Sequence, residues 1–119
     1  MRILLAALFL GHGIAHLPGF LVDWQLRSFP ELPFSTRILA GTVDVGLSGI
    51  KVLGVAWLLA GVVFATLSLA VVMRTPWWQA TAYGTILLSL MLCLAEWPGA
   101  RFGVVVNALI ATLMLLPLP

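Results

Sequence analysis

Two histidines near the start of the chain are the residues best suited to chemistry. His12 and His16 stand four residues apart in LFLGHGIAHLPGF, residues 8–20, a stretch that is otherwise apolar. On a helix, residues four apart lie one turn apart on the same face, so the two imidazoles should project together. Histidine titrates near neutral pH and ligates metals, and ionisable groups inside apolar helices usually mark a functional site. The pair is therefore the main candidate ligand or proton site.

The residue types around the pair leave three interpretations open. Two imidazoles at this spacing can ligate a metal or a haem iron, although a metal site needs further ligands and the chain has no third histidine. The pair can instead bind or protonate a small polar group, such as a quinone oxygen, with Asn107 or Thr85 assisting. In the third interpretation, the imidazoles hydrogen-bond Thr85, Ser89 or Asn107 on neighbouring helices and serve packing only.

The composition determines which medium must surround these residues. The chain has 119 residues, of which 62% are hydrophobic and only 8% are charged. A soluble domain carries about 25% charged residues, so this chain has too few charges to cover a water-exposed surface. The net charge of +2 comes from scattered residues and not from a basic patch, which argues against nucleic acid as a partner. The sequence predicts a protein whose solvent is the lipid bilayer.

The distribution of the charges predicts where helices cross that bilayer. A membrane-spanning helix needs about 20 apolar residues, and the charged residues separate four uncharged runs of about that length. We therefore expect an all-α fold, an integral membrane four-helix bundle, formed by a single transmembrane domain over residues 1–119. The expected spans are about 3–21, 52–73, 78–95 and 102–117, with a polar connection over 23–51.

The second half of the connection, ILAGTVDVGLSGIK at residues 38–51, has a mixed pattern. Residues 42–45 alternate between polar and apolar as a strand does, which predicts a short extended or interfacial segment. A continuous helix over 38–73 would measure about 54 Å, which exceeds the bilayer. It would also bury Asp44 or Lys51, at a cost of about 2.5–3.5 kcal/mol. Asp44 is expected instead to pair with Lys51 or Arg37 at the surface.

Tryptophan positions and flanking charges bear on the helix ends and on the orientation. The interfacial position of most tryptophans supports the expected span ends, and Trp57 alone falls well inside a span. The positive amino terminus with Arg2, set against a connection in which Asp23 offsets Arg27, favours cytoplasmic termini. Basic residues counted alone favour the opposite orientation. We take cytoplasmic termini as the expectation.

Small residues at helical spacing predict where the helices pack. Lipid is as apolar as leucine, so membrane helices associate through close contact of small residues and through interhelical hydrogen bonds. The expected packing positions are Ala7, Gly11, Ala15, Gly19, Gly84 and Gly103. Asn107 carries the only amide side chain inside an expected span. It should point inward, because an amide facing hydrocarbon is unfavourable.

Other motifs for chemistry are missing from the sequence. Cys93 is the only cysteine, so the chain cannot form an internal disulfide. No nucleophile elbow, oxyanion loop or phosphate-binding glycine loop is present, and no catalytic residue can be assigned. The acids are expected at the membrane edge, where Asp23, Asp44 or Glu96 could reach only the end of the site near His16. Neither a cofactor nor an enzymatic activity is indicated.

Three segments nevertheless resemble known membrane proteins. FLGHGIAHLPGF resembles the first-helix signature of DoxX-like proteins, in which a His-Gly pair at the end of a helix is followed three residues later by a basic residue. TVDVGLSGIKVLGVAWLLAG (42–61) and WPGARFGVVVNALI (97–110) look like segments of uncharacterised small four-span bacterial membrane proteins. The resemblance implies a four-helix bundle in the bacterial inner membrane, linked in some members to redox or quinone systems. Only His12 and Gly13 match the signature well, since His16 stands where a lysine is usual.

These observations lead to one main expectation of function and two alternatives. The main expectation is a non-catalytic membrane component or accessory subunit that packs in the lipid bilayer against a second copy or a different membrane subunit. The first alternative is a redox-linked membrane protein that binds a quinone, haem or metal through His12 and His16. The second is a small-solute transporter, which at 119 residues would need to oligomerise to form a pore.

Overall fold

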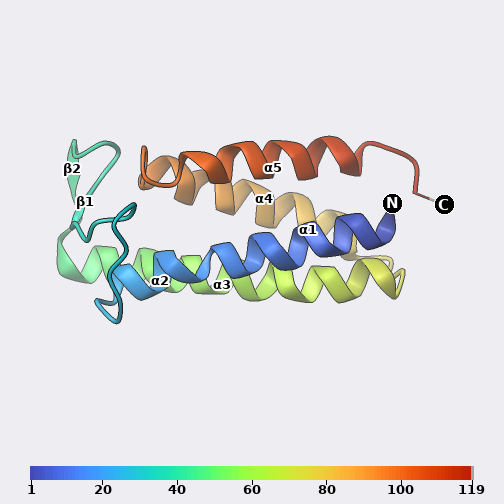
Figure 1. Cartoon of the computed structure of the whole chain (residues 1–119), viewed down its shortest axis with the longest axis horizontal. Coiled ribbons are helices and arrows are strands. Elements are labelled where there is room, and N and C mark those ends of the chain that lie inside the picture. Colours follow the sequence, from blue (N-terminus) through green and yellow to red (C-terminus); the bar gives the residue numbers. More distant parts are fainter. Residues whose placement is uncertain (119) are drawn as a thin grey trace.

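The computed structural model describes residues 1–118 and is mostly helical (Figure 1). Its helices are α1 (Arg2–Ala15), α2 (Leu17–Asp23), α3 (Gly46–Val72), α4 (Trp78–Ala95) and α5 (Arg101–Met114). Two short strands, β1 (Arg37–Ile38) and β2 (Val43–Asp44), form an antiparallel pair between α2 and α3. The sequence predicts an extended segment near residues 42–45, and β2 confirms it.

Helices α1 and α2 follow one another almost without interruption. His16 joins them with helical dihedral angles, and Pro18 lies in the first turn of α2, where a helix needs no backbone N–H donor. The proline therefore does not end the helix, and the apolar span runs from Arg2 to Asp23. It is longer than the predicted span 3–21, and Asp23 belongs to the helix instead of the connection.

Helix α3 also differs from its predicted bounds, because it begins at Gly46 and not at residue 52. Lys51 therefore lies inside the helix. Its ammonium group sits 5.1 Å from the centre of the Trp24 ring, and its carbonyl accepts a 2.9 Å hydrogen bond from the Trp24 indole N–H. A lysine that extends its ammonium group toward the interface does not force a helix to end.

The other two helices follow the apolar pattern more closely. Helix α4 has the predicted bounds of 78–95, while α5 ends at Met114, short of the predicted residue 117. Pro117 explains the early end, since a proline disfavours helical geometry in the residue before it and lacks the N–H that a further turn needs.

The connection between α2 and α3 folds over one end of the helices. Leu39, Ala40 and Gly41 all have positive φ angles, which reverse the chain between β1 and β2. This register places Arg37 opposite Asp44, but the Arg37 guanidinium donates to the Gly41 carbonyl at 3.1 Å, so the expected ion pair stays a prediction. The Leu39 N–H donates a 2.7 Å hydrogen bond to the carbonyl of Ala95, which attaches the turn to the end of α4.

The helices pack side by side in a closed order. The α1–α2 rod lies along α3, α3 lies along α4, α4 lies along α5, and α5 returns to α1 (Figure 1). The interior at the end that holds the amino terminus is purely apolar. Its fully buried side chains include Leu5, Phe9, Phe64, Leu67 and Ile110.

A close contact between helix backbones joins Gly13 of α1 to Gly61 of α3. A Cβ added to Gly13 would lie 2.7 Å from the Gly61 carbonyl oxygen, and one added to Gly61 would lie 2.8 Å from the Gly13 oxygen. Gly19 makes a second close contact, because a Cβ there would lie 2.6 Å from the Trp57 ring. Such close approach of backbones is typical of membrane helix pairs.

The packing face of α1 therefore differs from the predicted one. Ala7, Gly11 and Ala15 are exposed, and a Cβ added to Gly11 would contact nothing within 4 Å. Gly84 of α4 is likewise exposed, whereas Gly103 packs closely against the sulfur of Cys93. Several faces of a helix can carry small residues at four-residue intervals. The large apolar side chains and the histidines select the face that turns inward.

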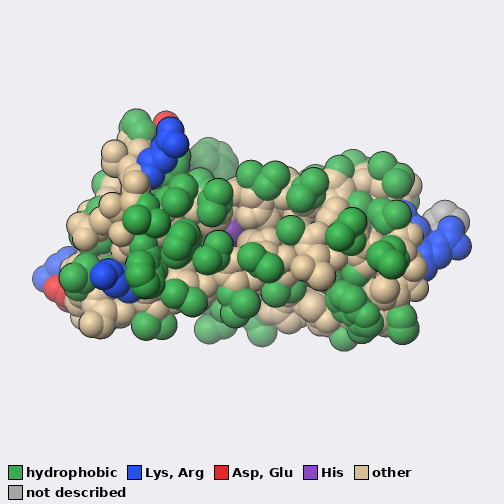
Figure 2. All heavy atoms as spheres, turned by 90° about the horizontal axis from the view of Figure 1, so that it is seen from below, with side chains coloured by type: hydrophobic (Ala, Val, Ile, Leu, Met, Phe, Trp, Pro, Cys, Tyr) green, Lys and Arg blue, Asp and Glu red, His purple; other side chains and the backbone are tan. Residues whose placement is uncertain are grey.

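The outer surface of the molecule is apolar along its sides. Figure 2 shows hydrophobic side chains over most of its length, with Lys, Arg, Asp and Glu gathered toward the two ends. The α1–α2 rod, α3 and α4 are each long and apolar enough to cross a membrane, and α5 is a shorter apolar helix. This arrangement is consistent with an integral membrane protein.

Candidate functional site

The two histidines lie together on the inner face of α1, as their spacing predicts. Their ring centroids are 4.6 Å apart, their planes are perpendicular, and both side chains are almost fully buried. The rings of Phe64 and Trp57 pack against them, 4.9 Å from His12 and 5.1 Å from His16 respectively. The imidazoles are therefore enclosed by aromatic rings from α3.

The hydrogen bonds of His16 determine which of its nitrogens carries the proton. Its Nδ1 lies 2.7 Å from the carbonyl oxygen of His12, which can only accept, so Nδ1–H is the donor. In the neutral ring Nε2 must then be an acceptor. It lies 2.8 Å from the Ser89 hydroxyl, which donates to it. Both nitrogens of His16 are engaged within the protein.

Asn107 determines the state of His12 by the same reasoning. The Asn107 amide N–H₂ donates to the Gly103 carbonyl at 2.9 Å and to the Ser89 oxygen at 2.8 Å. Its amide oxygen is therefore the atom that faces His12, and it accepts from His12 Nε2–H at 3.2 Å. Ser89 also lies 3.4 Å from the same His12 nitrogen, as a secondary contact.

These hydrogen bonds form a closed ring. His12 donates to Asn107, Asn107 donates to Ser89, Ser89 donates to His16, and His16 donates to the His12 backbone. We call these four residues the histidine circuit. It joins α1, α4 and α5 with every donor matched to an acceptor, which is the condition under which a buried polar network stabilises a fold.

The circuit brings together most of the site residues that the sequence predicts. Asn107 is fully buried, which confirms that it points inward. Thr85 is buried but stays outside the circuit, because its hydroxyl donates to the Thr81 carbonyl of its own helix at 2.7 Å. Among the described residues, Nδ1 of His12 is the one imidazole nitrogen without a hydrogen-bond partner.

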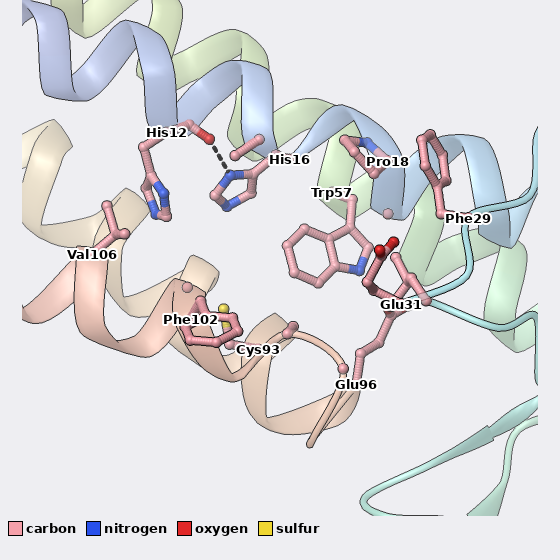
Figure 3. Close-up of a pocket in the computed structure, with 16 residues that line it drawn as sticks. His12, His16, Pro18, Phe29, Glu31, Trp57, Cys93, Glu96, Phe102 and Val106 are labelled. Carbon is pink, nitrogen blue, oxygen red and sulfur yellow. Dashed lines mark hydrogen bonds between the residues drawn. The ribbon is translucent and has the colours of Figure 1, made fainter.

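A cavity of about 320 Å³ lies beside the circuit. It is bounded by the α1–α2 rod, the connection near residues 29–32, α3 and the beginning of α5 (Figure 3). Its walls are largely apolar and include the rings of Phe29, Trp57 and Phe102, while His12 and His16 contribute polar atoms. Its volume falls at the lower end of the range for small-molecule sites.

The most unusual polar groups lie around Trp57 and Glu96, two residues of the cavity wall. Asp23 Oδ2, both carboxyl oxygens of Glu96 and the indole nitrogen of Trp57 are buried with no hydrogen-bond partner in the described part of the chain. Glu96 interacts with Asp23 and with Trp57, but neither contact reaches hydrogen-bond geometry. We call Asp23, Trp57 and Glu96 the carboxyl cluster. More than nine in ten buried polar groups in proteins are paired, so the cluster is exceptional.

Burial controls the protonation of this cluster. Removal from water raises the pKa of the Glu96 carboxyl above its ordinary value of 4.5, and the polar contacts with Asp23 and Trp57 offset part of that rise. Glu96 also stands between two cavities, since a second one, of about 300 Å³, is lined by Asp23, Arg37 and Glu96. The cluster thus connects the interior cavity with the polar end of the molecule.

Sequence reasoning missed the burial of these acids. It predicts all the acids at the membrane edge, and Asp44 does lie exposed on β2, where its carboxylate accepts from the Gly46 N–H at 2.9 Å. Asp23 is instead 3% exposed. The available signal was Trp57, the one tryptophan away from the expected interfaces, which packs in the interior beside His16 and Glu96.

The geometry offers no ready metal centre. Within residues 1–118, no group of three or more His, Cys, Asp or Glu side chains is placed to hold a metal ion. Cys93 is buried and its sulfur packs against Gly103. The metal interpretation of the histidine pair therefore finds no third ligand among these side chains.

Comparison with known proteins does not assign the chain to a family. No family model, no curated protein and no solved structure matches it. The DoxX-like resemblance rests on one short segment, residues 9–20, and stays a prediction. The functional argument therefore depends on the histidine circuit, the cavity and the carboxyl cluster.

Proposed function

We propose that the chain is an integral membrane protein in which the α1–α2 rod, α3, α4 and α5 form a four-helix transmembrane bundle. Three of these elements have the length and hydropathy of membrane spans. The apolar sides and the charges gathered toward the ends match a bilayer with water on both sides (Figure 2). The proposed location is the bacterial cytoplasmic membrane, as the DoxX-like resemblance implies. Cytoplasmic termini are proposed from the charges that flank the first span, and reporters fused at each end test this orientation.

Within the membrane, the proposed role is a non-catalytic component that binds a small lipophilic molecule in the cavity beside His12. The observation that carries this proposal is the contrast between the internally hydrogen-bonded histidines and the largely apolar cavity beside them. The histidine circuit engages three of the four imidazole nitrogens internally, which leaves no activated base and nucleophile pair. The cavity itself combines largely apolar walls with a few polar side chains, as binding sites do.

Mass spectrometry on protein extracted in mild detergent tests this role. We expect a small molecule to be retained in a fixed ratio to the protein. Ala15→Trp should abolish its retention, because Ala15 lines the cavity and an indole would fill the cavity. Ala7→Trp is the matched control, since Ala7 is an exposed residue of the same helix that does not line the cavity. Equal retention by the two variants, or retention of detergent and bulk lipid only, would overturn the proposal.

A second candidate is the redox-linked alternative, in the form of a quinol-binding protein. One observation favours it: His12 lines the cavity and its Nδ1 can accept a hydrogen bond from a phenolic hydroxyl. A quinone among the retained molecules, lost in His12→Ala, would support this role over the first. If the first role is correct, replacing both His12 and His16 with alanine should lower stability. The unmodified protein should then have no redox or absorbance signal that the double variant could lose. The oligomeric transporter has no observation of its own in its favour.

A further inference from the structure

We propose that the ligand of the cavity is a small organic cation, a protonated amine with an apolar body, whose ammonium group binds at the carboxyl cluster. This inference rests on the proposed binding function and names the class of molecule bound. It follows from three features of the cavity, which are its supply of hydrogen-bond acceptors, the unpaired buried carboxyl oxygens and the aromatic walls.

The first feature is an excess of acceptors over donors. Glu31, Glu96 and His12 line the cavity and carry carboxyl oxygens and a ring nitrogen as possible acceptors, and the Trp57 indole is a possible donor beside them. The Glu96 oxygens and the Trp57 nitrogen are themselves covered by neighbouring atoms, which a ligand must displace to reach them. In the described chain, no Lys or Arg side chain lines this cavity. An ammonium group has three donors and no acceptor, so it complements such a wall, whereas a carboxylate or phosphate would be repelled.

The second feature is the lack of partners for buried oxygens. Asp23 is 3% exposed, and its Oδ2 and both Glu96 oxygens have no donor within the described residues. An unpaired buried carboxylate is strongly unfavourable, and a bound cation relieves this by supplying both positive charge and N–H groups. Glu96 borders the cavity directly, while Asp23 lines the neighbouring cavity and its carboxyl group contacts that of Glu96. Trp57, itself 5% exposed and unpaired at its nitrogen, independently marks the same position as incomplete.

The third feature is the aromatic wall. Phe29, Trp57 and Phe102 line the cavity, and a cation within about 6 Å of such a ring is attracted to its face, most strongly by Trp. The rings of Phe29 and Phe102 already have the guanidinium groups of Arg27 and Arg101 at 5.8 Å and 5.1 Å. Trp57 is the remaining aromatic ring of the wall; it is 5% exposed and lies between His16 and Glu96 (Figure 3).

Shape-matched pairs of amines and alcohols test the charge requirement. The probes are hexylamine with hexanol, 2-phenylethylamine with 2-phenylethanol, and 1-adamantylamine with 1-adamantanol. Calorimetric titration of the whole protein in nonionic detergent at neutral pH, with a detergent blank, measures each affinity. We expect at least one amine to bind tenfold or more tightly than its alcohol. This ratio is measured on the unmodified chain and does not depend on the folding of any variant.

Charge-removing variants then locate the ammonium group. Glu96→Gln should weaken amine binding about tenfold while alcohol binding is unchanged, and Asp23→Asn should act in the same direction. Asp44→Asn is the matched control, because Asp44 is an exposed acid outside the cavity, and it should leave both affinities unchanged. Thermal melting verifies that each variant is folded.

The outcomes separate the ligand class from the binding role. Equal affinities for alcohols and amines would overturn the cation while leaving the cavity as a binding site. Equal effects of Asp44→Asn and Glu96→Gln would also overturn it, because a nonspecific charge effect would then explain the preference. If no probe binds and the purified protein retains no molecule, the proposed binding function fails together with the cation.

Discussion

The histidine circuit and the carboxyl cluster are two groups of buried polar residues that border the same cavity. In the circuit, four side chains and two backbone carbonyls match every donor with an acceptor. In the cluster, three carboxyl oxygens and one indole N–H lie buried with no partner in the described chain. One group is complete within the protein and the other is not.

This difference distinguishes residues that stabilise the fold from residues that lack a hydrogen-bond partner in the ligand-free protein. A closed network of hydrogen bonds stabilises the packing of the helices that it joins, and it leaves little capacity for a ligand. Unpaired buried groups destabilise the free protein and gain most when a ligand pairs them. Histidines are the more familiar functional residues, yet here the acids have the stronger claim to a binding role.

The largest expected effect comes from separating the helices that carry the circuit. Gly13→Val should destabilise the fold by about 3 kcal/mol, because the new side chain would meet the backbone oxygen of Gly61, which cannot rotate away. Unfolding followed by helical circular dichroism in detergent measures this. Gly11→Val is the control, since a Cβ at Gly11 contacts nothing within 4 Å. Similar losses in the two variants would show that β-branching, and not the α1–α3 contact, is responsible.

Opening the circuit should have the next largest effect. Asn107→Leu removes one accepted and two donated hydrogen bonds, leaving His12 Nε2–H unpaired, and should cost about 2 kcal/mol of unfolding free energy. Thr112→Val provides the comparison, because that exposed hydroxyl bonds only to the Ala108 carbonyl of its own helix. The same unfolding measurement applies. A neutral Asn107→Leu would mean that the circuit does not stabilise the fold.

Changing the cluster should have the opposite sign. Glu96→Gln replaces a buried acid with an amide that can donate to Asp23, so the ligand-free protein should become about 1 kcal/mol more stable. Melting temperatures measured without and with a bound amine report the stability of the free protein and of the complex, respectively. Loss of stability in the ligand-free variant would show that the Glu96 carboxyl already has a favourable partner.

The smallest expected effect is a dependence of stability on pH. The pKa of Glu96 is raised in the folded state, so the folded protein holds this proton at pH values where the unfolded chain has lost it. Stability should therefore fall as pH rises from about 4.5 to the raised pKa and stay level above it. Asp44 acts in the other direction, because the hydrogen bond from Gly46 lowers its pKa. The Glu96→Gln variant should show a smaller fall than the unmodified protein, and melting curves from pH 4 to pH 9 test this.

The sequence could predict the features that depend on composition and local spacing. Uncharged runs located the helices, with α4 matching its predicted bounds, because exclusion of charge from hydrocarbon acts residue by residue. Helical spacing placed His12 and His16 together, and polarity placed Asn107 inside. None of these inferences needs knowledge of how one helix faces another.

The features that depend on neighbouring helices could not be predicted in this way. Ala7, Gly11 and Ala15 have the spacing of a packing stripe, but Gly13 makes the contact, because the inward face is set by Phe9 and the histidines. The burial of Asp23 and Glu96 arises where the ends of α2 and α4 meet over Trp57. A single sequence does not show which residues of different helices come into contact.

The unequal lengths of α3 and α5 have a consequence for the surrounding lipid. Helix α3 has 27 residues and α5 has 14, which correspond to lengths of about 40 Å and 21 Å. A hydrocarbon core of about 30 Å is shorter than the first and longer than the second. In the proposed transmembrane arrangement, the bilayer would therefore be thinnest beside α5, whose first turns also line the cavity. A molecule dissolved in the acyl chains would meet the shortest path to the cavity on that side.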